Sequence, residues 1–161
     1  VDVMSSRSLT SGDIEAFSEA ISHFFVTMTE ERANVRSAYL LEPDVEPIVW
    51  DDFNGVITVH GGYVGSLAFS APRALLSHVL LRMGEKNLSD DHRRDIIGEI
   101  ANTLSGRVRR YFGEGLRIST PQSFSGQDQR VERLAHSTPY VIPLRWKQYE
   151  AKLVVHLDVM M

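Results

Sequence analysis

The feature that most constrains the fold is a segment, residues 95–111, whose polar and apolar residues fall on opposite sides of a helix. At about 100° per residue, four positions form one line that we call the polar stripe: Asp95, Glu99, Asn102 and Gly106. The large apolar side chains face the other way, together with one alanine: Ile96, Ile97, Ile100, Ala101, Leu104, Val108 and Tyr111. Such a helix must rest one face on a hydrophobic core and present the other to solvent.

The ends of this helix are marked by residues that suit helix termini. Ser89 is a good N-cap, and Asp90 and Asp91 place negative charge in the first turn. Three arginines crowd the other end before Gly113: Arg107, Arg109 and Arg110. We predict a helix over residues 90–112 and interpret the arginines as partners of the helix dipole and as solvated charge, in preference to a phosphate site.

Hydrophobic periodicity and turn residues predict the remaining elements. Helices are expected over residues 12–29 and from Pro72 to Gly84. Strands are expected over 35–41, 47–50, 55–60, 63–69, 116–120, 139–146 and 149–159, with a hairpin turn at Gly61-Gly62 and a polar loop over 123–133. With no linker or low-complexity tract, the pattern predicts one α/β (α+β) domain over residues 1–161 with a mainly antiparallel sheet.

Composition narrows the class of function. The 161 residues carry a net charge of −4 and no cysteine, which argues against nucleic-acid binding and excludes thiolate chemistry. No apolar run reaches the length of a membrane span and no signal peptide is evident. We therefore expect a soluble, cytoplasmic protein that binds neither nucleic acid nor membrane.

Familiar catalytic motifs are missing. The six histidines never occur at zinc-binding spacing, and the sequence contains neither a phosphate-binding P-loop nor a G-x-S-x-G nucleophile elbow. The sequence therefore predicts no metal site and no cofactor of its own.

The polar stripe nevertheless offers a chemistry that needs no metal. An asparagine amide such as that of Asn102 can accept a hydrogen bond from a water molecule and donate one to a phosphoryl oxygen. A glutamate one turn away, Glu99, can pair with a lysine of a partner protein. Gly98 and Gly106 cost helix stability, which is understandable if a partner surface comes close, so we predict that both glycines contact it.

At these residues the chain resembles the CheX branch of the CheC, CheX and FliY phosphatases, which dephosphorylate the chemotaxis response regulator CheY. The family pattern of an acid, Glu and Asn is present as Asp95, Glu99 and Asn102, within Gly98-Glu-Ile-Ala-Asn102 and followed by Gly106. Similarity continues in residues 65–70 and 118–121 and at Gly126.

The resemblance implies a CheC/CheX-like fold with a first helix, a short helix and a long active-site helix. It also implies that Asn102 orients the attacking water, that Glu99 contacts the regulator's lysine, and that Asp95 borders the site. Magnesium would arrive with the phosphorylated regulator, and the protein would be a homodimer joined through its sheets.

The first predicted helix faintly repeats the spacing of the polar stripe. Glu15 and Glu19 are followed by Ser22 where the two-site members of the family carry asparagine. Serine is too short for the two hydrogen bonds of an asparagine amide, so we predict that this surface is inactive.

Two other functions compete with the phosphatase. A non-catalytic binding module, comparable to the middle domain of the flagellar switch protein FliM, would share the architecture without the Glu99 and Asn102 pair. A DNA-binding helix pair around residues 84–89 is opposed by the acidic residues that would face the phosphates: Asp90, Asp91, Asp95 and Glu99.

Overall fold

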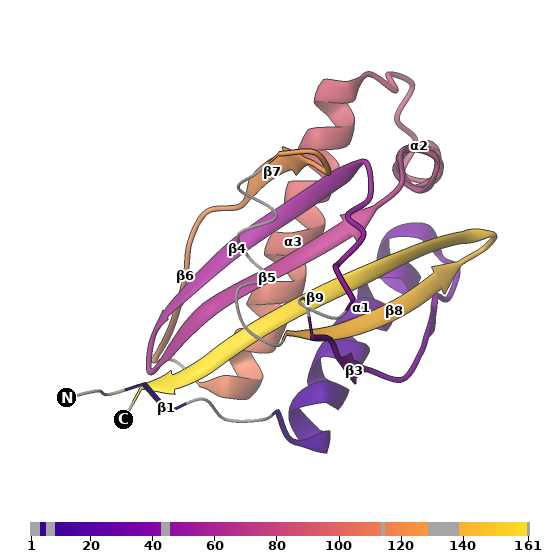
Figure 1. Cartoon of the computed structure of the whole chain (residues 1–161). Coiled ribbons are helices and arrows are strands. Elements are labelled where there is room, and N and C mark those ends of the chain that lie inside the picture. The colour runs from indigo at the N-terminus through magenta and orange to yellow at the C-terminus, as the bar shows by residue number, and fades with distance from the viewer. Residues whose placement is uncertain (1–3, 6–8, 43–45, 114, 129–138, 161) are drawn as a thin grey trace.

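The computed structural model describes residues 4–5, 9–42, 46–113, 115–128 and 139–160, and places three helices against an antiparallel sheet (Figure 1). The sheet has nine strands, six of which follow the order β2-β8-β9-β5-β4-β6, while β1 pairs with β9, β3 with β8 and β7 with β4. All of these pairs are antiparallel, which confirms the predicted fold class. In Figure 1, α1 and α3 lie behind the sheet and β8 and β9 run in front of α1.

Two long hairpins form the centre of the sheet. The first joins β4 (Phe53–Gly61) to β5 (Tyr63–Ala71), and Gly61 has the positive φ of 108° that a tight turn between them requires. The second joins β8 (Tyr140–Trp146) to β9 (Tyr149–Met160), and β5 pairs with β9 to bring the hairpins together. Both hairpins lie where the sequence predicts them.

Short strands complete the edges of the sheet. β2 (Asn34–Val35) and β3 (Tyr39–Leu40) pair with opposite ends of β8. On the other side, β6 (Leu116–Ile118) and β7 (Gln122–Ser125) pair with successive parts of β4, and β1 (Met4–Ser5) pairs with the end of β9.

The three helices begin where the local sequence satisfies their free backbone groups. α1 (Ser11–Thr29) starts with a reciprocal capping box, in which Thr10 and Asp13 each accept from the other's backbone NH at 3.1 and 3.0 Å. α2 (Arg73–Arg82) follows Pro72, and its first NH donates to the carboxylate of Asp52 at 2.9 Å. α3 (Asp90–Phe112) has the predicted bounds and the predicted Ser89 N-cap.

The main hydrophobic core fills the space between the helices and one face of the sheet. Its largest fully buried side chains come from α1, β5 and β8 and from the buried face of α3; they include Phe17, Phe24, Phe25, Phe69, Trp146, Ile97, Ile100 and Leu104. A smaller cluster covers part of the opposite sheet face, where Ile48 and Trp50 pack against buried side chains of the strands. The core thus supports α3 along most of its length.

α3 lies unusually close to the sheet at one point on β4. A Cβ atom placed on Gly55 would stand 2.3 Å from the backbone oxygen of Ile97 and 3.1 Å from the Cβ of Ala101. Real side chains do not tolerate the shorter distance, so glycine at this position allows the helix backbone to rest on the strand.

Three sequence predictions are wrong in detail. The strand expected over residues 35–41 is instead the two short strands β2 and β3, and residues 36–38 between them belong to no strand. Residues 47–50 are not a strand, although Ile48 and Trp50 do alternate toward the sheet as a strand pattern would require. The predicted loop over residues 123–133 begins within strand β7, because residues 122–125 pair with β4; the part over 129–133 lies outside the described residues.

Candidate functional site

The polar stripe lies on the solvent side of α3, as predicted. Asp95, Glu99 and Asn102 are exposed, whereas the side chains at 96, 97, 100, 101, 104 and 108 are buried against the core. Glu99 and Asn102 are three residues apart on one helix, which places their Cβ atoms about 5–6 Å from each other. A carboxylate and a carboxamide therefore project side by side from a helix that the core holds in place.

The side chains of the polar stripe have no partner among the residues that the structure describes. Within the described part of the chain, Asp95, Glu99 and Asn102 make no side-chain hydrogen bond or ion pair. The neighbouring charged residues of α3 do have partners: Asp91 contacts Arg94, and Asp90 contacts Arg93. The polar stripe is therefore free to contact another molecule, whereas Asp90 and Asp91 are engaged in ion pairs within the protein.

The two glycines of the site have different environments. Gly98 is buried, and a Cβ there would lie 3.4 Å from the Oγ of Ser123 and 3.6 Å from the Cβ of Pro121. Ser123 also donates a 2.7 Å hydrogen bond to the carbonyl of Arg94, which ties β7 to α3. The surface that comes close to Gly98 thus belongs to the chain itself. Both distances are ordinary van der Waals contacts, so this packing would also accommodate alanine and does not by itself require glycine.

Gly106 is half-buried, and a Cβ atom placed on it would have no neighbouring atom within 4 Å, so the space beside it is open. It borders a hollow shared with Arg109, Arg110 and Gly113. The spacing in the sequence groups the two glycines together, but only Gly106 faces space that another molecule can enter.

The C-terminal end of α3 corrects one prediction and refines another. Tyr111 is expected on the buried face, but its side chain is 51% exposed and lies beside α1. Among the arginines, Arg109 donates from Nε to the carbonyl of Leu116 at 2.9 Å, and Arg107 pairs with Glu19 of α1 at 3.2 Å. Two of the three arginines thus bind specific groups within the fold in addition to any effect of the helix dipole.

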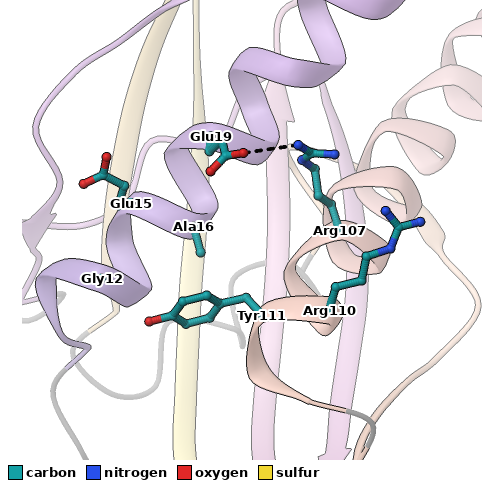
Figure 2. A pocket seen from close by; sticks show the side chains of 7 residues that line it. All are labelled: Gly12, Glu15, Ala16, Glu19, Arg107, Arg110 and Tyr111. Atoms are coloured by element: carbon teal, nitrogen blue, oxygen red, sulfur yellow. Dashed lines mark hydrogen bonds and ion pairs between the residues drawn. The ribbon is translucent and has the colours of Figure 1, made fainter.

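A groove of about 530 Å³ separates α1 from the end of α3 (Figure 2). The α1 surface that repeats the spacing of the stripe forms one wall, with Glu15 and Glu19 exposed and Ser22 half-buried nearby. Figure 2 shows Glu19 reaching across the groove to Arg107. Sequence analysis missed this contact, because opposite charges on two distant helices give no signal until the helices are packed together.

The N-terminus of α3 is anchored by a charged cluster. Asp90 accepts from Arg93 at 2.8 Å and also contacts Arg73 of α2, which in turn lies 5.2 Å over the ring of Phe53. The hydrogen bond from Arg73, followed by that from Arg93, lowers the pKa of Asp90 from its ordinary value of 3.8. This cluster fixes where the helix that carries the stripe begins.

Replacing Asp90 by asparagine should therefore reduce stability in a pH-dependent way. Because folding lowers the pKa, the ionised carboxylate stabilises the protein above the unfolded value of 3.8, and this contribution is lost as the pH falls through the lower folded value. Thermal unfolding should show a lower Tm for Asp90→Asn than for the wild type at pH 7, and this difference should shrink progressively as the pH falls below 3.8. Glu85→Gln is the control, because Glu85 is an exposed acid with no partner among the described residues. The Tm difference between Glu85→Gln and the wild type should not change with pH. A constant difference for Asp90→Asn at all pH values would contradict this account.

Neither a metal cluster nor a membrane helix is found in the residues that the structure describes. No three or more His, Asp or Glu side chains among them are arranged to hold a metal ion. No helix in these ranges combines the length and the apolar character needed to cross a bilayer.

Comparisons with known proteins agree with the fold. The family model described as chemotaxis phosphatase CheX matches residues 53–145, a range that contains the whole polar stripe. No curated protein sequence matches the chain.

Solved structures give a likeness over nearly the full length. The chemotaxis protein CheX from Vibrio vulnificus is 18% identical, with a TM-score of 0.75 over 91% of this chain and 99% of that one. CheX in the complex with CheY, BeF3 and Mg2+ from Borrelia burgdorferi is 15% identical, with a TM-score of 0.69 over 89% of this chain and 96% of that one. The FliM middle domain from Vibrio alginolyticus is 9% identical, with a TM-score of 0.59 over 89% and 90% of the two chains.

Proposed function

The chain belongs to the chemotaxis phosphatase CheX family, and on this premise we propose that it hydrolyses the aspartyl phosphate of a CheY-like response regulator by means of Glu99 and Asn102. The observation that carries the proposal is the pair itself. Both side chains are exposed, neither has a partner among the described residues, and both stand on a helix fixed by the core.

The reaction is the attack of water on phosphorus. The new P–O bond forms in line with the bond to the aspartate oxygen, which breaks, so that the aspartate leaves as a carboxylate and inorganic phosphate forms. The protons of the water leave with the phosphate or pass to solvent. No covalent intermediate on this chain is required, which agrees with a site made of an amide and an acid.

We assign Asn102 to the attacking water. Its amide oxygen accepts a hydrogen bond from the water while its NH2 group donates to a phosphoryl oxygen, which fixes the angle of attack. The amide does not titrate, so this role is independent of pH. An exposed position on the helix is necessary, because the amide must enter the active site of another protein.

Glu99 is assigned to a lysine of the regulator. A carboxylate whose Cβ lies about 5–6 Å from that of Asn102 can form a charge-assisted hydrogen bond with an ammonium group beside the phosphorylated aspartate. This contact sets the register of the two proteins. Asp95 and Gly106 lie above and below the pair on the same stripe and are proposed to border the contact, while Gly98 supports it through its packing on β7.

The metal of the reaction is proposed to come with the partner. The Borrelia burgdorferi structure holds CheX and CheY together with BeF3 and Mg2+. Regulator carboxylates are suitable ligands for Mg2+, which needs oxygen donors and phosphoryl oxygens. On this proposal the chain acts in the cytoplasm and supplies only the two side chains that complete the regulator's site.

The decisive experiment follows phosphate loss from a purified phosphorylated CheY-type regulator of the source genome, with and without this protein. The proposal is supported if this protein accelerates phosphate loss over many turnovers and if the acceleration needs Mg2+. Binding without acceleration would favour the second candidate, a non-catalytic module, for which the fold likeness to the FliM middle domain is the supporting observation.

We also propose that the protein is a homodimer joined at the edge of its sheet. β3 lies at this edge, where Tyr39 and Leu40 are 46% and 51% exposed. Exposed apolar residues on an edge strand favour pairing with a second chain.

Leu40→Asp should therefore convert a dimer to a monomer, because it places a charge in the apolar contact. Light scattering on both proteins measures the change in mass. The matched variant Leu81→Asp alters a similarly exposed leucine on α2 and should leave the dimer intact. A monomeric wild type, or a Leu40→Asp dimer, would contradict the proposal.

A further inference from the structure

The arginine at position 110 differs from its two neighbours in having no described partner. Arg107 pairs with Glu19, and Arg109 donates to the carbonyl of Leu116, so both have a role within the fold. Within the described residues Arg110 is exposed and makes no hydrogen bond or ion pair. Figure 2 shows its side chain extending alongside α3 without reaching α1.

Arg110 also occupies a boundary between two hollows. It lines the groove between α1 and α3, and it lines the hollow beside Gly106 together with Arg109. Helical geometry places it about 60° around the axis from Asp95, on the side of Glu99 and Gly106, and about 12 Å along the axis from Asn102. The polar stripe therefore leads past Gly106, beside which the space is open, to the unpaired positive charge of Arg110.

A protein that docks on Glu99 and Asn102 must also contact this region. Specific interfaces bury about 800 Å² on each partner, far more than two side chains provide. Toward the N-terminus of α3, Asp91 is paired with Arg94 and Asp95 is left as an unpaired negative charge among the described residues. Toward the C-terminus, Arg110 is an unpaired positive charge, so this end is the basic one. Apart from the lysine that is proposed to pair with Glu99, a regulator whose active site gathers a phosphoryl group and metal-binding carboxylates is more complementary in charge to the basic end of α3 than to the end that carries Asp95.

We propose that Arg110 is a docking and specificity residue, which binds acidic side chains of the regulator that face α3 about 12 Å along the helix axis from Asn102. This inference rests on the proposed function, because it concerns the same partner. Arg110 acts on affinity and rate of association rather than on the reacting atoms, since it lies too far from Asn102 to touch the phosphoryl group. It selects regulators with acidic side chains at that place and disfavours those with basic ones.

The test measures the affinity for CheY activated with BeF3 and Mg2+, which does not depend on hydrolysis. Arg110→Glu should weaken binding about tenfold at low salt, Arg110→Lys should retain most of the affinity, and the salt dependence of binding should become smaller for Arg110→Glu. The rate at saturating regulator should remain that of the wild type. Arg117→Glu is the matched control, because this exposed arginine lies on β6 between two residues that face the main core and so points to the other side of the sheet.

Each outcome separates the two proposals. Equal affinities for Arg110→Glu and Arg117→Glu would overturn the role of Arg110 and leave the proposed function standing. Wild-type binding without acceleration of phosphate loss would overturn the proposed function alone, and absence of wild-type binding would overturn both. An acid-to-lysine change on the regulator that restores the affinity of Arg110→Glu would identify the acidic partner of Arg110.

Discussion

Asn102→Ala should slow the stimulated loss of phosphate from the regulator by about 100-fold or more. In the proposed reaction the amide is the one group of this chain that contacts the water, and loss of a single well-placed hydrogen-bonding group in an active site commonly costs a factor of about 100 to 1,000. The side chain is exposed and has no described partner, so its removal should leave the unfolding midpoint unchanged. The measurement is regulator phosphate decay at saturating protein, together with urea unfolding.

Two variants make the result specific. Ser22→Ala changes the equivalent position on α1 and should retain wild-type acceleration, because that surface is predicted to be inactive. Asn102→Asp retains the shape but places a negative charge beside the phosphoryl group and removes the NH2 donor, so it should be as impaired as alanine. Wild-type activity in Asn102→Ala would contradict the assignment of Asn102 to the attacking water.

Gly55→Val should strongly reduce stability, because it introduces a side chain where α3 rests on β4. The new Cβ would meet the backbone oxygen of Ile97 at 2.3 Å, and backbone cannot move aside as the end of a flexible side chain can. Overpacking of this kind costs about 1–3 kcal/mol, occasionally more. Urea unfolding should show the loss directly.

The same variant tests the connection between the core and the site. A clash at Ile97 should shift the helix that carries Glu99 and Asn102, and a displacement of about 1 Å is enough to reduce a reaction rate 100-fold. Phosphate decay should therefore fall even at temperatures where Gly55→Val remains folded. Gly62→Ala, at a glycine with open space around it, should change stability by less than about 0.5 kcal/mol and leave the activity intact. Full activity in folded Gly55→Val would show that the helix position does not depend on this contact.

The sequence was most informative where periodicity was strong. The bounds of α3, its N-cap and the exposed line of Asp95, Glu99 and Asn102 follow from the 3.6-residue repeat, because one helix face has to reach the core. The hairpins followed from turn glycines and alternation for a similar reason. The family resemblance was carried by the same helix, and the match over residues 53–145 confirms it.

What the sequence did not reveal depends on tertiary contacts. Ile48 and Trp50 alternate like strand residues because both bury against the sheet, but alternation reports burial and not strand pairing. The packing of Gly98 under Pro121 and Ser123 required knowledge of where β7 lies. Tyr111 falls on the apolar side of the helical projection, yet it lines the groove between α1 and α3 and is 51% exposed, while the core contact at this end of the helix is made by Phe112. The proposed chemistry of Glu99 and Asn102 stays a prediction until the regulator assay is done.

The outward placement of Glu99 and Asn102 has a consequence for inhibitor design. Drug-sized compounds gain most of their affinity by filling concave sites, and a pair of polar groups on a convex helix surface offers little to enclose. A miniprotein or antibody fragment that supplies its own cleft for the helix would suit this surface far better. Screening campaigns should accordingly favour such macromolecular binders over small-compound libraries.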